Sequence, residues 1–357
     1  LVPLPFAATV PGDTVSAPTR FRHGTLRPML FIPFLHACRD VLRTSARVCA
    51  SLFKIMIPVL IGVKIAVELG MIAFLAAPLA PVMALVGLPP EMGLVWATAM
   101  VNTIYGALVV FGGVAAATPL TGAQATALGV MVLVAHALPI EIGIARAAGL
   151  RPLPMILLRV CGAIALGAAI SAGYGALGLG QQPALVLWQS PRVADPTLAR
   201  WAVGELRNLG LVVVSVTLLI SLLRILEALR VTHGMHWLLA PVFRLIGVSR
   251  KASSLTIIGL TMGISYGGGL IIGEARSGRL PGREIFFSLA FLGLCHSLFE
   301  DSLLLVLIGG SLPGLVLGRL LFAVAVVAML VRLTARLSEE RFAWLLLKPA
   351  KQPGAKG

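Results

Sequence analysis

Two histidines and three carboxylates stand out because they lie in stretches of the chain that are otherwise apolar. His296 is followed by Glu300 and Asp301, and His136 is followed by Glu141. The two histidines are 160 positions apart (296 − 136 = 160), and so are the last carboxylates (301 − 141 = 160). Neutral imidazole is a common ligand for Fe, Zn or Mn, and buried carboxylates often carry protons. These residue types predict that the chain binds a metal ion or a proton.

The predicted metal ligands are His136, His296 and Glu300. In a continuous helix Glu300 lies one turn after His296, on the same face. Glu300 also has no counterpart in the earlier stretch, where Ile140 stands, so it departs from a pure scaffold pattern. The alternative is that both histidines are hydrogen-bonded core residues. The residues alone leave the two interpretations open.

Two arginines, also 160 positions apart, are expected to neutralise the carboxylates. Glu141 precedes a turn near 150 by about nine residues and Arg159 follows it by about nine; Asp301 and Arg319 stand in the same relation to a turn near 310. An unpaired charge at that depth in a bilayer costs at least about 2.5–3.5 kcal/mol. We therefore predict the ion pairs Glu141–Arg159 and Asp301–Arg319. Such pairs are either architectural or open to bind a substrate or a proton.

A second repeated pattern combines polar residues with glycines. Asn102 and Tyr105 lie in one copy, and Ser265, Tyr266 and a run of three glycines lie in the other, at an offset of 161. The glycine run predicts either a small-residue packing face or unwound backbone facing a cavity. The full predicted substrate-binding set is Asn102, Tyr105, His136, Glu141, Ser265, Tyr266, Gly267, Gly268, His296, Glu300 and Asp301.

The composition determines the environment of these residues. The 357 residues are 58% hydrophobic and 12% charged, whereas soluble domains carry about 25% charged residues. This predicts a polytopic membrane protein, with the lipid bilayer as its partner. The net charge of +15 is concentrated between apolar segments, where it reports orientation and not a nucleic-acid partner. The four cysteines show no CxxC spacing and indicate free thiols.

The predicted fold class is an all-α polytopic membrane protein with two inverted-topology repeats of about five helices each. The predicted boundaries are an N-terminal cytoplasmic or interfacial segment at 1–49, a first repeat at 50–175, a polar linker at 176–206, a second repeat at 207–337 and a basic tail at 338–357. The predicted spans are 50–69, 71–88, 94–113, 123–147 and 153–175, then 208–228, 234–248, 253–273, 285–308 and 314–334. The second span of each set is short and contains Pro, so we leave open whether it crosses fully.

An odd number of spans per repeat turns the second copy upside down, as in many secondary transporters, whose substrate sites lie near the midplane between repeats. The distribution of basic loops predicts that both termini lie on the cytoplasmic side of a bacterial inner membrane. Arg250 and Lys251 then fall on the opposite side, against the rule, and so do the arginines of the linker.

The stretches from Ile264 to Gly269 and from His296 to Asp301 resemble bacterial membrane proteins with nucleoside-recognition (Gate) domains. The resemblance covers about 50–335, with one Gate-like unit in each half. Gate domains are similar to membrane parts of ferrous-iron transport protein B and of concentrative nucleoside transporters. The resemblance therefore implies a transport fold. No Gly-x4-Gly-Lys-Ser/Thr motif occurs, so the GTPase part of the iron transporter is absent.

We expect a transporter or permease for a small polar solute, with a divalent metal ion slightly favoured as the substrate and no resident cofactor. The alternatives are a nucleoside transporter and a non-transporting membrane scaffold. The chain has no His-Glu-x-x-His and no Gly-x-Ser-x-Gly motif, so no catalytic residue and no enzyme activity are predicted. A homo-oligomer is compatible with the sequence.

Overall fold

A computed structural model describes residues 39–47, 49–50, short pieces between 53 and 69, and then 71–115, 117–187, 197–228, 231–245 and 248–348. Every named element in these ranges is a helix, which confirms the all-α class for this part of the chain. The predicted span 50–69 is described only in pieces, most of the segment 1–49 lies outside the described residues, and the predicted tail 338–357 is described as far as residue 348.

The helices of the first half are α2 (Ile72–Ala76), η1 (Ala77–Leu79), α3 (Ala80–Val86), α4 (Met92–Val101), α5 (Ile104–Val114), α6 (Gly122–Val134), α7 (Leu138–Ala147) and α8 (Pro152–Ala176). Those of the second half are α9 (Leu198–Ala228), α10 (Val231–Leu245), α11 (Arg250–Met262), α12 (Ile264–Arg276), α13 (Gly282–Leu294), α14 (Glu300–Val306), η2 (Gly314–Gly318), α15 (Arg319–Thr334) and α16 (Glu339–Leu346).

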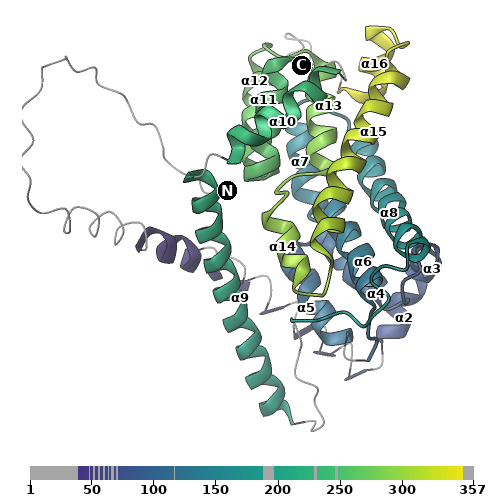
Figure 1. Cartoon of the computed structure of the whole chain (residues 1–357), viewed down its shortest axis with the longest axis vertical. Helices are drawn as coiled ribbons and strands as arrows, with labels where there is room; N and C mark the ends of the chain where they lie inside the picture. Colours follow the sequence, from purple (N-terminus) through teal and green to yellow (C-terminus); the bar gives the residue numbers. More distant parts are fainter. Residues whose placement is uncertain are drawn as a thin grey trace, which may run out of the picture.

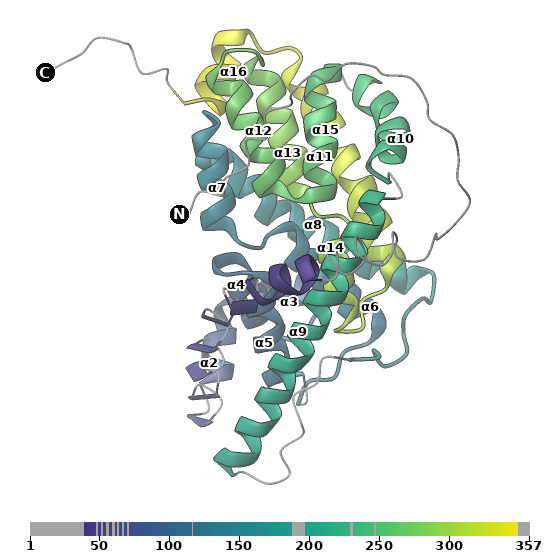
Figure 2. The same cartoon turned by 90° about the vertical axis from the view of Figure 1, so that its left-hand side faces the viewer.

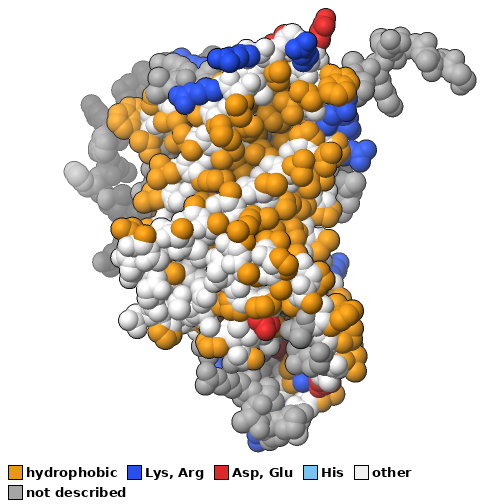
Figure 3. Space-filling view, turned by 90° about the vertical axis from the view of Figure 1, so that its right-hand side faces the viewer, with side chains coloured by type: hydrophobic (Ala, Val, Ile, Leu, Met, Phe, Trp, Pro, Cys, Tyr) orange, Lys and Arg blue, Asp and Glu red, His pale blue; other side chains and the backbone are white. Residues whose placement is uncertain are grey.

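Four helical stretches among the described residues are long and apolar enough to cross a membrane. They are Gly122–Ala147, Pro152–Ala176, Leu198–Leu218 and Gly314–Thr334. The first contains the break between α6 and α7. Apolar side chains cover much of the face shown in Figure 3. This distribution fits a protein whose outer surface meets lipid.

Two of the predicted spans are hairpins that enter and leave on the same side. The segment predicted as 94–113 folds into α4 and α5, and the segment predicted as 253–273 folds into α11 and α12. Both helices of the first hairpin lie in the lower half of Figures 1 and 2, and both helices of the second lie in the upper half. Their 10–13 residues give lengths of about 15–20 Å, against a hydrocarbon core of about 30 Å. The prediction of one span in each place is therefore wrong.

Contacts at both ends of the second hairpin show its antiparallel course. Lys251, at the start of α11, and Arg279, just after α12, both donate to Glu274 at the end of α12. These donors, Arg279 first, lower the pKa of the half-buried Glu274 carboxyl. Deeper in, a Cβ built on Gly267 of α12 would lie 2.3 Å from the Cα of Gly259 in α11. The glycines allow the two backbones to touch, which is the small-residue packing role predicted for the glycine run.

The two broken helices α6–α7 and α13–α14 run in opposite directions. At one end of the molecule the 184–187 segment bonds to Leu120, just before α6, and to Leu307, just after α14. At the other end Arg151, just after α7, bonds to the backbone of Leu346, and Leu347 packs on the first residue of α13. The start of α6 thus lies with the end of α14, and the end of α7 lies with the start of α13, as Figure 1 also shows.

Basic residues gather at the end that holds α16, which we call the basic end; Figure 3 shows most of its visible Lys and Arg side chains there. Arg283 donates to Glu339 and to two backbone carbonyls that precede α16. Arg250 and Lys251 belong to the same end, because α11 starts beside α13: Ser249 donates to Glu284. The hairpin therefore removes the exception that the predicted topology left at these two residues.

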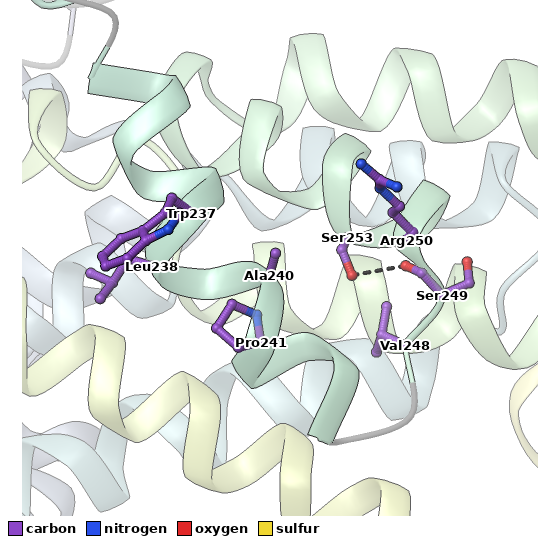
Figure 4. A pocket seen from close by; sticks show the side chains of 8 residues that line it. All are labelled: Trp237, Leu238, Ala240, Pro241, Val248, Ser249, Arg250 and Ser253. Carbon is purple, nitrogen blue, oxygen red and sulfur yellow. Dashed lines mark hydrogen bonds between the residues drawn. The ribbon is translucent and has the colours of Figure 1, made fainter.

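A cavity of about 740 Å³ lies between α10 and α11, away from the predicted site residues. Its lining includes Trp237, Leu238 and Pro241 on one side and Val248 and Arg250 on the other (Figure 4). Among the described residues that line it, none is a histidine or a carboxylate. The predicted histidines and carboxylates lie instead at the breaks in two helices.

Candidate functional site

The breaks in α6–α7 and α13–α14 have the same local geometry. Ala137 and Ser297, 160 positions apart, have φ angles of 47° and 43°. Among the described residues they are the non-glycine residues with positive φ. This conformation is costly for residues with a Cβ and often marks functional sites. The strain recurs at equivalent positions, so it is a shared structural feature of both halves.

Each hairpin tip is tied to one of these breaks. The backbone N–H of Ala137 donates to the carbonyl of Ala99 at 2.9 Å, and the N–H of Leu298 donates to the carbonyl of Leu260 at 2.9 Å. Gly263, at the tip of the second hairpin, has a φ of 90° and faces the Ser297 hydroxyl. Two hairpin tips and two helix breaks therefore converge, and the histidines lie among them.

The imidazoles of His136 and His296 face each other with their Nε2 atoms 3.3 Å apart. The Nδ1 of His136 donates to the carbonyls of Val132 and Leu133 at 3.2 and 3.1 Å, and the Nδ1 of His296 donates to the carbonyl of Leu292 at 2.7 Å. A carbonyl only accepts, so each Nδ1 carries the proton, and each neutral ring leaves its Nε2 lone pair free. Two lone pairs thus point at one another.

Two carboxylates complete the arrangement. Glu141 Oε1 lies 3.5 Å from the Nε2 of each histidine, and Asp301 Oδ2 lies 3.8 and 3.9 Å from them. We call these four atoms, from His136, His296, Glu141 and Asp301, the acceptor cluster. Buried acceptors that face one another without a hydrogen between them are unfavourable. A cation, whether a metal ion or a proton, makes the arrangement favourable.

The dimensions of the cluster suit a small metal ion. A regular tetrahedron with metal–nitrogen bonds of about 2.0–2.1 Å has edges of about 3.3–3.4 Å. The two Nε2 atoms match that edge at 3.3 Å, and the carboxylate oxygens lie farther from them, at 3.5 to 3.9 Å. Among the described residues, the ligand atoms of His136, His296 and Asp301 all lie within 4.8 Å of one another. Two imidazoles with carboxylates form a ligand set suited to Zn, Fe or Mn.

The two buried arginines differ in their partners. Arg159 Nη1 forms the predicted ion pair with Glu141 Oε2 at 2.8 Å, and its Nη2 donates to the carbonyl of His136 at 2.9 Å. Arg319 Nη2 likewise donates to the carbonyl of His296. However, no ion pair within 4.0 Å joins Arg319 to Asp301 in the described part of the chain, so the prediction of that pair differs from the structure. Asp301 is turned to the imidazoles instead.

The predicted metal ligand Glu300 is not part of the acceptor cluster. Its assignment assumed a continuous helix in which His296 and Glu300 share a face. The structure ends α13 at Leu294 and begins α14 at Glu300, so His296 lies outside both helices. The i, i+4 relation therefore does not hold. Asp301 brings its carboxylate to the imidazoles in place of Glu300.

The remaining predicted residues surround this centre or lie apart from it. Tyr105 is half-buried and lies close enough to Glu300 and Asp301 to interact with them electrostatically. Asn102 lies at the tip of the first hairpin, where its amide covers Gly106. Gly268 faces Ile144 of α7 and serves helix packing, as Gly267 does. The side chains of Ser265 and Tyr266 lie outside the described residues.

Comparison with known proteins adds a membrane relative. The chain is 26% identical over 287 residues to the uncharacterized membrane protein YvoD of Bacillus subtilis (strain 168), a match that covers 77% of this chain and 87% of that protein. Together with the apolar helices, this similarity identifies a membrane protein. No family model matches the chain, so the resemblance to Gate domains stays a prediction. No solved structure matches it either.

Proposed function

We propose that this protein is a membrane transporter whose substrate is a divalent transition-metal ion, bound at the acceptor cluster. The observation that carries the proposal is the approach of two bare imidazole nitrogens to 3.3 Å, with two carboxylate oxygens beside them. A scaffold would be expected to satisfy such buried atoms with donors. A nucleoside would need hydrogen-bond donors as well as acceptors, whereas all four atoms of the cluster are acceptors.

The arrangement of the helices supports transport more than storage of an ion. Broken helices that run in opposite directions and two re-entrant hairpins meet at the cluster, as expected for inverted repeats with a midplane site. Unwound backbone is tolerated in a membrane where it is buried in protein or lines a cavity. We place the basic end in the cytoplasm, following the distribution of Lys and Arg, and with it the C-terminal helix α16.

Calorimetry of the purified protein with Zn²⁺, Fe²⁺ and Mn²⁺ tests the proposal. Binding of at least one ion is expected, and His296→Ala should abolish it while leaving the protein folded, because loss of a neutral ring strands no charge. Tyr174→Phe is the matched control: it removes a hydroxyl that bonds Ser311, far from the cluster, and should bind as the wild type does.

Uptake of the same ion into proteoliposomes then separates transport from binding alone. Ion uptake that depends on His136 and His296 supports the transporter. Binding without uptake would indicate a metal-stabilised scaffold. If folded wild-type protein binds none of the three ions, the metal proposal is wrong.

A further inference from the structure

The two halves of the site differ in one respect that their repeat does not explain. Arg159 uses its Nε on the carbonyl of Val134, its Nη2 on the carbonyl of His136, and its Nη1 on Glu141. Arg319 uses its Nη2 in the same way, but among the described residues its Nε and Nη1 have no hydrogen-bond acceptor. The side chain is fully buried. A buried guanidinium with two unpaired donors is energetically unfavourable, because buried donors are normally paired.

Among the described residues, Asp301 is the carboxylate whose position relative to Arg319 repeats that of Glu141 relative to Arg159 (301 − 141 = 160). The Cys295 thiol lies next to the guanidinium, but a neutral thiol is a weak acceptor. The preceding turn, Gly314–Gly318, is a π-helix, whereas Arg159 lies within the regular helix α8. A π-turn is a common feature of functional positions. The second half of the site therefore has both a missing partner and an altered backbone.

The difference in side-chain length accounts for the missing partner. Glu141 contacts Arg159 with one oxygen and the imidazoles with the other. Asp301 is shorter by one carbon–carbon bond, about 1.5 Å, and its carboxylate reaches the imidazoles without reaching Arg319. Its side chain is also the more exposed of the two, at 13% against 4% for Glu141. Asp301 can thus serve one partner at a time.

We propose that Asp301 is the moving part of the site, alternating between the acceptor cluster, where it holds the ion, and Arg319, where it releases it. Glu141 and Arg159 form the fixed half. This inference rests on the proposed metal transport. Arg319 then acts as a positioning residue that competes with the ion for Asp301. Such competition weakens the site enough for the ion to leave, which a transporter requires and a structural metal site does not.

The charge-conserving variant Asp301→Glu tests this in the full-length protein, with Zn²⁺ as the probe. The longer carboxylate should contact Arg319 and the imidazoles together, as Glu141 does. Zn²⁺ binding should stay within about threefold of the wild type, while uptake into proteoliposomes should fall by about tenfold or more, because the competition is gone. The thermal unfolding temperature should rise, since Arg319 gains a partner.

The double variant Glu141→Asp/Asp301→Glu is the matched control. It exchanges the fixed and moving halves without changing charge or composition, and it should recover part of the uptake that Asp301→Glu loses. Wild-type uptake by Asp301→Glu would overturn the inference. So would joint loss of Zn²⁺ binding and uptake in that variant, because Asp301 would then be a ligand and nothing more.

Structures of the wild-type protein with and without Zn²⁺ keep the inference testable if the variants do not fold. The expected result is an Asp301–Arg319 ion pair in the ion-free protein and its absence in the loaded one. Identical Asp301 contacts in both would overturn the moving carboxylate. Absence of Zn²⁺ binding by the wild type would instead overturn the proposed metal function, so the two failures are distinguishable.

Discussion

At the scale of single residues, the buried charges depend on one another, and this dependence can be measured. Arg159→Ala leaves the buried carboxylate of Glu141 without its partner at 2.8 Å. Removing one member of a buried pair costs about 3–5 kcal/mol, so the folded yield should fall sharply. Gel filtration of detergent-solubilised protein measures this yield. Glu141→Ala/Arg159→Ala strands no charge and should recover part of it; equal yields from the single and double variants would contradict the pairing.

Protonation of the same site predicts a direction for the effect of pH. The imidazoles bind a metal ion through the Nε2 lone pair, and a protonated ring has none. Lowering the pH should therefore weaken ion binding, because protons compete with the ion for the same lone pairs. Calorimetric titrations at a series of pH values, over the range in which the protein stays folded, test the direction. An affinity that rises as the pH falls would contradict ligation by His136 and His296.

Part of this site could be predicted from single residues, and part could not. The shared offset of 160 positions already related His136 to His296, and the structure brings their rings together. The choice of Glu300 over Asp301 failed because it assumed helical geometry across residues 295–299, which are not helical. Ala137 and Ser297 carry no sequence signal for a positive φ. Only the structure reveals the strain at these two positions.

At the scale of helices, the second hairpin depends on backbone contact between its two arms. Gly267→Ala places a methyl group 2.3 Å from the Cα of Gly259, so the arms must separate. Overpacking of this kind costs about 1–3 kcal/mol, and ion binding should weaken as the tip at Gly263 shifts. The matched control is Gly269→Ala, where no atom lies within 4 Å. Thermal unfolding should show a loss for Gly267→Ala and no loss for Gly269→Ala.

The hairpins escaped prediction because both of their arms are apolar, and their joined length equals that of one span. Local signals were nevertheless present. Thr103 caps α5 by accepting from the Gly106 N–H, and Gly263 stands between α11 and α12 with a φ of 90°. Such residues mark helix starts and ends within a stretch of continuous hydropathy. Hydropathy identifies the segments that are apolar, but it does not distinguish one long span from a hairpin of two short helices.

At the scale of the whole molecule, the hairpins change which residues face which side. One span from 253 to 273 puts Arg250 and Arg279 on opposite sides, whereas the hairpin puts both at the basic end. This is consistent with the tendency of Lys and Arg to remain in the cytoplasm. Among the described residues of the second half, Leu198–Leu218 and Gly314–Thr334 are long and apolar enough to cross a membrane. The broken helix α13–α14 runs between the two ends of the molecule. The inverted arrangement of the two repeats stays a prediction.

Accessibility of single cysteines decides between the two topologies. In a variant without native cysteines, Arg250→Cys, Arg279→Cys and Gln181→Cys each place one thiol at an exposed position. A membrane-impermeant maleimide added to intact spheroplasts should label Gln181→Cys, which lies at the end opposite the basic end. Arg250→Cys and Arg279→Cys should react only after the membrane is permeabilised, because the hairpin returns to the side from which it enters. Labelling of Arg250→Cys together with Gln181→Cys in intact spheroplasts would instead support a single span from 253 to 273. In that topology Gly263 would not be a hairpin tip beside the acceptor cluster.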